Sequence, residues 1–476
     1  MARTIAIDPV TRIEGHARIS IQLNDDDSVR ACRLHITQVR GFEAFCVGRP
    51  LEEMPGLTSR TCGICPVSHQ LASAKACDQL LAVQIPPAAV LLRKLLNYGQ
   101  LVQSHALSFF HLSSPDLLLG MDSDPEQRNI FGIAAAFPEV ARDGIALRRF
   151  GQQLIERLAG KRIHPNWVVP GGVSRPLSRE NRETILAELP EMLLKARRNL
   201  TRLEELLPRF APEITAFTPP ATSFMALAGP ENQLEYYDGP LRLLDAAGRP
   251  LVEALPPNRY EEIIAEAVES DSYLKSPFYR PQGPEQGIYR VGPLARLNLA
   301  ASCGTDQADE ALARFRQATA NHGLPQSAFH YHYARLIEII HGLEMIGALL
   351  ADPQILASRV RAVAGANAPE GVGICEAPRG TLIHHYRIDD QGRISGVNMI
   401  IATGNNNLAI NQGILQAARA LVKNGEFSEG ALNRIEALIR CYDPCLSCST
   451  HTQGARPFRV EIVRQGAVIE GMTKLS

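Results

Sequence analysis

The chain has 476 residues, and its 49 Lys and Arg nearly balance its 50 Asp and Glu, which leaves a formal net charge of −1. This balance gives no electrostatic footprint for nucleic acid or for an anionic membrane surface. Hydrophobic residues make up 45% of the chain, which is typical of a globular protein with a sizeable core. No apolar run approaches the roughly 18 residues of a membrane span, and residues 1–9 carry no secretory signal. We therefore expect a cytoplasmic protein without nucleic-acid or membrane partners.

The first part of the chain alternates apolar and polar residues, as half-buried strands do. Strands are predicted at 3–7, 16–22 and 30–40, with a Pro- and Gly-bounded loop at 8–16. From about residue 67 the apolar period becomes helical. Helices are predicted at 67–83, from Pro87 to about Ser113, at 125–159 and around 189–207.

The second half is more varied. Residues 208–300 are rich in Pro, Gly and Tyr and predict loops, short strands and one helix near 259–270. The remaining predicted elements are helices at 305–321, 327–351, 407–422 and 428–441, a hairpin of 382–388 with 394–402, and a last short hairpin of 458–463 with 468–469.

The pattern as a whole predicts an α+β, mainly helical protein, in which long helices form a bundle and β layers lie at its edges. Residues 1–476 are expected to form one unit because no repeat or low-complexity linker divides them. Its parts are a β-rich region at 1–66, a helical body at 67–441 with a hairpin at 380–402, a short motif at 442–451 and a tail at 452–476.

Two of the chain's cysteine pairs have the spacing of metal ligands. Cys62 and Cys65 lie in R-T-C-G-I-C-P-V-S-H, and Cys445 and Cys448 lie in D-P-C-L-S-C-S-T-H. A C-x-x-C sequence lets two thiolates converge on one metal, and two such pairs supply four soft ligands. The predicted helix start after Cys65 would favour its thiolate form.

Spacing alone leaves a structural zinc site open as an alternative. Zinc modules usually place their two halves a few tens of residues apart, whereas here Cys62 and Cys445 are 445 − 62 = 383 positions apart. Closing a loop of that length is not forbidden. It implies that the fold surrounds the site.

The residues around these cysteines resemble the large, catalytic subunit of nickel–iron hydrogenases. The family's two cysteine motifs are matched at Arg60–His69 and Asp443–His451. R-I-E-G-H at 12–16, an H-x-L…P-D segment ending at Asp116 and E-A-P-R-G at 376–380 also match, in the same order along the whole length. The stretches V-R-G-F-E at 39–43 and C-E-A-P-R-G-T-L-I-H-H-Y at 375–386 are most similar to the cytoplasmic, NAD-reducing, bidirectional branch.

The resemblance implies that all four cysteines bind nickel, and that Cys65 and Cys448 also bridge to an iron carrying carbon monoxide and cyanide. It places Arg379 over the open site, with Asp116 and Asp443 as the carboxylates that hold this arginine and the second motif. Pro378 would form an apolar wall, and the Thr403 hydroxyl would bond a cyanide. By composition alone, Arg379 would be read as a surface arginine after a Pro turn.

The resemblance also implies a proton route and a second cation. The proton would go first to Cys445 and then to Glu14, which by itself would be read as a solvated loop residue. Magnesium would be bound by Glu43, a backbone carbonyl near Met399, and His451. His69 would hydrogen-bond a ligand sulfur.

The sequence shows no spare cysteine run for an iron–sulfur cluster and no dinucleotide-binding G-x-G-x-x-G, so we expect no cluster, flavin or NAD site in this chain. The resemblance therefore implies that electrons pass to NAD through partners, namely an iron–sulfur small subunit, then flavin-containing diaphorase partners. It also implies a maturation endopeptidase that removes 452–476. Two alternatives remain: a hydrogenase linked to NADP, a deazaflavin or a sensory partner, and a non-catalytic scaffold with a four-cysteine zinc site.

Overall fold

The computed structural model describes residues 4–269, 272–319, 323–450, 457–464 and 467–475, the last two ranges as backbone strands. The chain begins with an antiparallel sheet of β1 (Thr4–Ile7), β2 (Ala17–Leu23) and β3 (Val29–Ile36). Alternate residues of β2 are buried, which confirms the predicted period of two. The buried face lies towards α13, while the loop between β1 and β2 runs inward to the second cysteine motif.

The first cysteine motif lies between short helical turns and a long helix. The turns are α1 (Phe42–Cys46), η1 (Leu51–Glu53), α2 (Met54–Thr58) and η2 (Ser59–Thr61), and the helix is α3 (Pro66–Leu80). Pro66 occupies the first helical position, where its missing N–H leaves no bond unmade. Cys65 therefore stands at the N-terminal end of α3.

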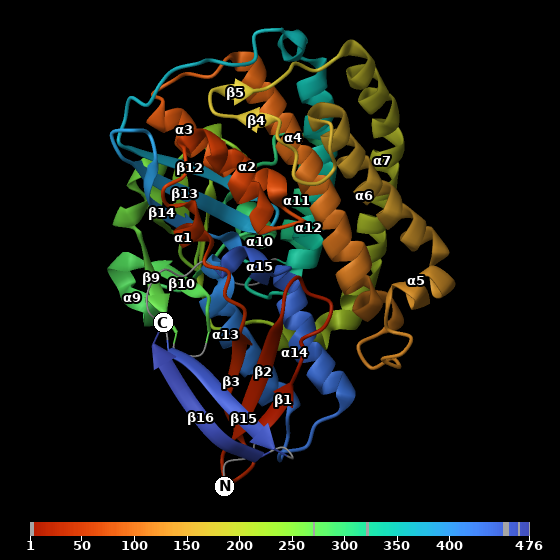
Figure 1. Cartoon of the computed structure of the whole chain (residues 1–476). Helices are drawn as coiled ribbons and strands as arrows, with labels where there is room; N and C mark the ends of the chain where they lie inside the picture. Colours follow the sequence, from red (N-terminus) through yellow and green to blue (C-terminus); the bar gives the residue numbers. More distant parts are fainter. Residues whose placement is uncertain (1–3, 270–271, 320–322, 451–456, 465–466, 476) are drawn as a thin grey trace.

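A bundle of long helices forms one side of the molecule (Figure 1). Its members are α4 (Pro87–Ala106), α6 (Pro138–Ala159), α7 (Arg179–Leu206) and α12 (His330–Ala351). α4 and α6 approach each other closely at Gly99, where a Cβ would lie 2.6 Å from the Leu154 side chain. Beyond α4 the chain continues in wider helical turns, η3 (Leu107–Ser113) and η4 (Pro115–Leu119), past the helix end that the sequence predicts.

The single helix predicted at 125–159 is two helices, α5 (Ile130–Ala136) and α6. Phe137 separates them with φ −131° and ψ 60°, outside the helical region. The ring of Pro138 disfavours a helical conformation for the residue before it. The prediction was wrong because it gave this proline no weight.

The middle of the chain forms small sheets. A four-stranded sheet has the order β11–β6–β7–β8, and β9 pairs with β10. Their bounds are β6 (Ser223–Leu227), β7 (Leu241–Leu244), β8 (Pro250–Leu255), β9 (Ile264–Val268), β10 (Lys275–Tyr279) and β11 (Tyr289–Arg290). The helix predicted near 259–270 is wrong: a short turn, η7 (Pro257–Glu262), leads into β9, whose residues gain their backbone partners from β10.

The sheet on which the helix after the first cysteine pair packs has three antiparallel strands, β12 (Glu370–Ala377), β13 (Gly380–Ile388) and β14 (Ile394–Ile400). The sequence predicts the β13–β14 hairpin but not β12, which is buried on both faces and therefore lacks alternation. Helix α3 packs on this sheet. After β14 come α13 (Ala402–Leu421), α14 (Glu429–Tyr442) and α15 (Leu446–Ser449).

The other elements are shorter or more peripheral. They are β4 (Val168–Val169), β5 (Gly172–Val173), η5 (Leu207–Phe210), α8 (Ala211–Ala216), η6 (Pro230–Asn232), η8 (Arg280–Gln282), α9 (Gly283–Gln286), α10 (Pro293–Leu299), α11 (Asp306–Ala318), η9 (Pro353–Leu356), β15 (Pro457–Arg464) and β16 (Ala467–Leu475). Among the helices of the described residues, none has the length and apolar character needed to cross a membrane.

Candidate metal centre

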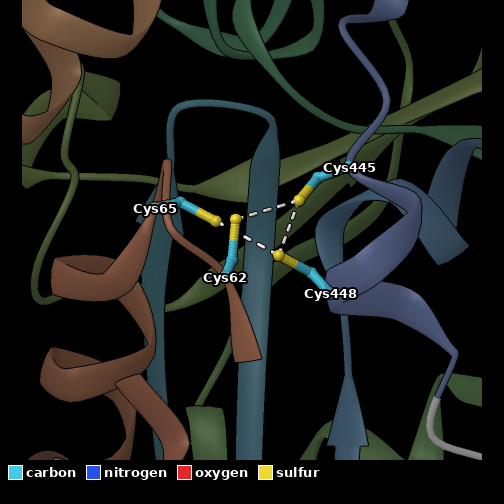
Figure 2. Close-up of side chains that lie close together, drawn as sticks. All are labelled: Cys62, Cys65, Cys445 and Cys448. Carbon is cyan, nitrogen blue, oxygen red and sulfur yellow. Dashed lines mark hydrogen bonds between the residues drawn. The ribbon is translucent and has the colours of Figure 1, made fainter. Parts of the chain in front are cut away.

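Four cysteine sulfurs from distant parts of the chain meet in the interior (Figure 2). Cys62 and Cys65 come from the loop before α3, Cys445 directly precedes α15, and Cys448 lies within α15. The sulfur of Cys62 lies 3.3 Å from that of Cys445, and the sulfur of Cys65 lies 3.3 Å from that of Cys448. All four sulfurs lie within 4.8 Å of one another, about twice a metal–sulfur bond of roughly 2.3 Å. One metal, or two adjacent metals, can therefore contact all four.

The charge balance of this cluster calls for a cation. Burial raises the pKa of Cys445 and of Cys448 well above the usual value for a thiol. Hydrogen bonding, first from Cys445 and then from Cys448, lowers the pKa of Cys65. Four buried thiols cannot all ionise beside one another without a compensating positive charge. Soft, deprotonated sulfur ligands in this arrangement fit nickel and iron as well as zinc.

The β1–β2 loop is joined to the second cysteine motif. Glu14 and Cys445 form a parallel β-bridge, and the Glu14 carbonyl accepts a bond of 3.1 Å from the Leu446 N–H. The Glu14 Oε2 accepts one of 3.0 Å from the Ser447 N–H. Gly15 permits this approach, since it has φ +87° and a Cβ there would lie 2.8 Å from the Leu446 Cβ. The structure thus brings the Glu14 carboxylate beside the second cysteine pair.

Arg379 and three of the cysteines line one small cavity. The remaining lining residues are Ser68, His69, Ala377, Leu382, Ile401, Ala402 and Thr403. The Arg379 Nε donates to the Asp443 carbonyl at 2.5 Å, and its Nη2 lies 3.1 Å from the Asp443 Oδ1. Burial alone would lower the pKa of Arg379, but Asp443 and the cysteine sulfurs raise it, so the guanidinium stays charged.

Asp116 makes different contacts from those expected. Its Oδ1 lies 2.6 Å from Arg12 Nη2, and its Oδ2 lies 3.0 Å from Arg440 Nε. Despite burial, these arginines lower the pKa of Asp116. Among the described contacts Asp443 alone of the two carboxylates holds Arg379, because Asp116 is engaged by α14 and the β1–β2 loop. Asp116 thus fixes the helix that leads into the second motif.

The turn that carries Pro378 and Arg379 is held by a buried arginine that the sequence did not single out. Arg296 donates to the carbonyls of Ala377 and Pro378 at 3.0 and 3.1 Å. Its charge is met by Glu338 and Glu376 at 2.7 and 2.8 Å. No motif surrounds Arg296, so no sequence signal marked it. Thr403, on α13, accepts a bond of 2.9 Å from the Cys445 N–H.

Glu43 lies in a second polar cluster. Its Oε1 accepts a bond of 2.8 Å from the Met399 N–H, so the amide of Met399 rather than its carbonyl makes the described contact. Lys275 Nζ lies 3.3 Å from Glu43, 3.4 Å from Glu266 and 3.0 Å from the Asn398 Oδ1. Burial raises the pKa of Glu43 to about 7. His451, the third expected ligand, lies outside the described residues.

The cluster around Glu43 contains more carboxylates than cations. Two carboxylates, Glu43 and Glu266, face one ammonium group, and because burial raises the pKa of each, both would be ionised at neutral pH only beside a further cation. Oxygen ligands of this kind suit magnesium. Lys275, Glu266 and Asn398 were missed because they lie in stretches without a recognisable motif.

His69 contacts a second histidine on β13. Its Nδ1 lies 3.1 Å from the Nε2 of His384, and His69 lines the same cavity as Cys65, Cys445 and Cys448, where it helps to lower the pKa of Cys65. The other six cysteines are buried and free. Among the described residues, the four sulfurs are the only group of three or more potential ligands close enough to share an ion.

Comparison with known families agrees with this geometry. A family model described as "Nickel-dependent hydrogenase" matches residues 40–124 and 237–451, and one described as "HoxL-like" matches residues 4–39. Together they span well over half of the chain. The chain belongs to the nickel-dependent hydrogenase family.

Individual hydrogenases match nearly the whole chain. It is 39% identical to the NAD-reducing hydrogenase HoxS subunit beta of Cupriavidus necator, over 97% of each chain. It is 40% identical to an F420-non-reducing hydrogenase (vhu) subunit of Methanococcus voltae, over 88% of this chain and 99% of that one. A crystal structure of an NAD+-reducing NiFe hydrogenase in the H2-reduced state superposes with a TM-score of 0.91 at 46% identity, covering 94% of this chain and 99% of that one.

The fold is shared more widely among hydrogenases. The Ni-Fe-Se hydrogenase from D. vulgaris Hildenborough matches with a TM-score of 0.76 at 22% identity, over 95% of this chain and 100% of that one. The predicted hydrogenase large-subunit fold is thus confirmed. As a hydrogenase large subunit, the chain is an oxidoreductase that acts on dihydrogen.

Proposed function

We propose that this hydrogenase subunit cleaves dihydrogen reversibly and heterolytically, and that its electrons pass to NAD through an iron–sulfur small subunit, then through flavin-containing diaphorase partners. The observation that carries the proposal is the closed group of four buried sulfurs. The NAD linkage is supported by near full-length similarity to a subunit of an NAD-reducing hydrogenase and to an NAD+-reducing structure. The partners and the acceptor are inferred from those relatives.

The four cysteines would hold a nickel–iron centre. Cys62 and Cys445 would be terminal nickel ligands, and Cys65 and Cys448 would bridge nickel and iron. When bound, this centre supplies the cleavage of dihydrogen into protons and reducing equivalents. The assignment is supported by the cavity beside Cys65 and Cys448, where Ala377, Leu382 and Ile401 offer apolar walls for carbon monoxide and cyanide.

Neighbouring side chains would shape that cavity. Pro378 would contribute to its apolar wall from the turn held by Arg296. The Thr403 oxygen accepts the Cys445 N–H, which leaves the hydroxyl proton available for a cyanide nitrogen. Arg379, fixed by Asp443, would place a permanent positive charge next to the reacting dihydrogen.

Protons would leave through the second motif. Cys445 would receive the proton first, and Glu14 would carry it outward. The β-bridge between these residues supports this order, and a carboxyl held beside a thiolate is a suitable relay. His69 would stabilise the Cys65 thiolate.

Magnesium would bind near Glu43 and Met399, with His451 as a further ligand. The pairing of two carboxylates, Glu43 and Glu266, with the single ammonium group of Lys275 supports this site. We also propose that residues 1–476 form one cytoplasmic catalytic unit, and that a maturation endopeptidase removes 452–476 after the metals are inserted.

The test is infrared spectroscopy of the purified complex, with nickel, iron and zinc measured on the same sample. Carbon monoxide and cyanide bands with about one nickel per chain support the proposal. A chain ending at His451 that holds only zinc would overturn it in favour of a structural scaffold. Reduction of NADP or a deazaflavin in place of NAD would overturn the acceptor alone.

A pair of variants sharpens this test. Cys448→Ser should lose nickel, because serine is a poor ligand for a soft metal. Cys375→Ser should keep it, since Cys375 is buried nearby but lies outside the group of four sulfurs, and its sulfur bonds the Ser68 carbonyl at 3.5 Å. Equal nickel content in both variants would contradict the ligand assignment.

A further inference from the structure

A line of three buried side chains leads from the first cysteine pair into the sheet β12–β13–β14. The His69 Nδ1 lies 3.1 Å from the His384 Nε2, and the His384 Nδ1 lies 2.5 Å from the Tyr386 Oη. All three residues are at most 1% exposed. Because the His69 Nδ1 is engaged by His384, the Nε2 is the nitrogen left for the sulfurs of the cavity that His69 lines together with Cys65, Cys445 and Cys448.

The direction of these hydrogen bonds follows from the sulfur. A cysteine that binds a metal is a thiolate and has no proton to donate, so the His69 Nε2 must donate. An imidazole that donates from Nε2 and is not protonated at both nitrogens has only an acceptor at Nδ1. His384 must therefore donate from its Nε2.

The same reasoning extends to the last residue. If the His384 Nε2 carries the proton, its Nδ1 is an acceptor, and the Tyr386 hydroxyl must donate to it. Burial raises the pKa of Tyr386 well above its usual value, so this hydroxyl keeps its proton. The donor and acceptor of each hydrogen bond in the line are thus fixed by the neighbouring bond.

We propose that His384 and Tyr386 are positioning residues, which lock one tautomer of His69 and so keep a hydrogen bond directed at a cysteine thiolate of the cavity that His69 lines. The inference rests on the proposed nickel–iron centre. A hydrogen bond to a ligand sulfur withdraws electron density from it and from the metal it binds. The line would therefore set the electron density at the iron.

The burial of Tyr386, at the end of the line away from the cysteines, favours a role in orienting His69 over a role in conducting protons. Tyr386 is fully buried in an apolar cluster with Met54, Cys77 and Leu80. The Thr58 and Ser73 side chains next to Tyr386 are also fully buried, so a proton leaving through Tyr386 would not reach solvent. Glu14, by contrast, is partly exposed.

The test compares infrared spectra and midpoint potentials of the purified complex with those of Tyr386→Phe. Loss of the hydroxyl frees the tautomers of both histidines. The carbon monoxide band should shift to lower frequency, because more electron density stays on the sulfur and the iron. Tyr333→Phe is the matched control: it removes a buried hydroxyl that donates to the Glu204 Oε1 at 2.6 Å, and its bands should match those of the wild type.

Variants of His384 test the same relationship in a second way. His384→Gln should keep the wild-type band, since its amide can donate to the His69 Nδ1 without help from Tyr386. His384→Met should shift the band in the direction of Tyr386→Phe. In the His384→Gln background, adding Tyr386→Phe should cause no further shift, which is the non-additivity expected of one linked system.

The outcomes separate this inference from the proposed function. A wild-type sample without carbon monoxide and cyanide bands would overturn the metal centre and the inference together. Wild-type bands that stay unchanged in Tyr386→Phe would overturn the positioning role alone. If Tyr386→Phe does not fold, identical bands in the Gln and Met variants of His384 would overturn it equally.

Discussion

The main chain of Glu14 pairs with that of Cys445 in a parallel β-bridge, so a loop near the start of the chain is locked to a motif near its end. The Glu14 carboxylate is held there by the Ser447 N–H at 3.0 Å. This arrangement places the Glu14 carboxylate, a proton acceptor, directly beside the second cysteine motif. It also makes the acceptor removable without removing the bridge, since the bridge uses only backbone atoms.

Glu14→Gln should therefore keep the fold and lose proton transfer. The amide oxygen can still accept from Ser447, but it cannot carry a proton at neutral pH. Dihydrogen oxidation should fall about 10²–10⁴-fold, with nickel content and infrared bands unchanged. Glu436→Gln is the control, because Glu436 also accepts an N–H from the β1–β2 loop, that of Thr11 at 2.6 Å. Equal losses in both variants would argue against a relay at Glu14.

Arg379→Lys tests the charge over the cavity. Lysine keeps the charge but cannot bond the Asp443 carbonyl and carboxylate together as the guanidinium does. The rate should fall by about 10²-fold or more in a dye-reduction assay, while metal content stays constant. Arg249→Lys, at an exposed pair with Asp245, should have no effect. A fully active Arg379→Lys would show that the fixed geometry is not needed.

Glu43→Gln tests the second cation. Glutamine can still accept from Met399 and Lys275, but the cluster loses the negative charge that magnesium would balance. Magnesium content should drop well below that of the wild type, and the Tm should no longer respond to a chelator. Glu262→Gln, at an exposed pair with Arg259, should respond as the wild type does. Unchanged magnesium in Glu43→Gln would remove Glu43 from the ligand set.

Three buried histidines of α12 should make the protein sensitive to acid. Burial lowers the pKa of His330 and of His341 to about 4 and that of His332 to about 3, whereas in the unfolded chain each is near 6.5. Between these values the unfolded chain binds more protons, so stability rises with pH and falls as pH drops below about 6.5. At pH 5 each histidine should lower the free energy of unfolding by roughly 2 kcal/mol relative to pH 7.

Thermal unfolding at pH 7 and pH 5 measures this effect. The Tm should fall clearly at pH 5. His330→Gln should narrow the difference, because one of the three groups is gone and the helix α12 that carries it is otherwise unchanged. A Tm that is the same at both pH values would contradict the assignment of these histidines as buried and neutral.

Helices and strands could be predicted where apolar residues recur with the period of a helix or a strand. The strands β2 and β3 and the helices α7, α12 and α14 follow the predicted alternation and helical spacing. β12 could not be found in this way, because a strand buried on both faces has no alternation to detect. β9 was read as a helix because its partner β10, and hence its backbone pairing, is not visible from local residues.

The site divides along a similar line. The residues within motifs were found from the sequence, and the structure brings Cys62, Cys65, Cys445 and Cys448 together with Glu14, Arg379 and Asp443. Residues that act by supporting the motifs were not found: Arg296 behind the Pro378 turn, Lys275 beside Glu43, and the bond between His69 and His384. Their partners come from distant elements, and pairing between distant single residues leaves no mark on a sequence read alone.

The distance between the two cysteine pairs along the chain determines how long the first pair exists before the second is synthesised. A ribosome that adds about 5–20 residues per second makes Cys445 roughly 20–80 s after Cys65, because 445 − 65 leaves 380 residues to be added. During that time the first cysteine pair exists without the second pair. A metal captured then would meet two thiols instead of four. We therefore expect the metals to be inserted after translation, when both cysteine pairs are present to bind them.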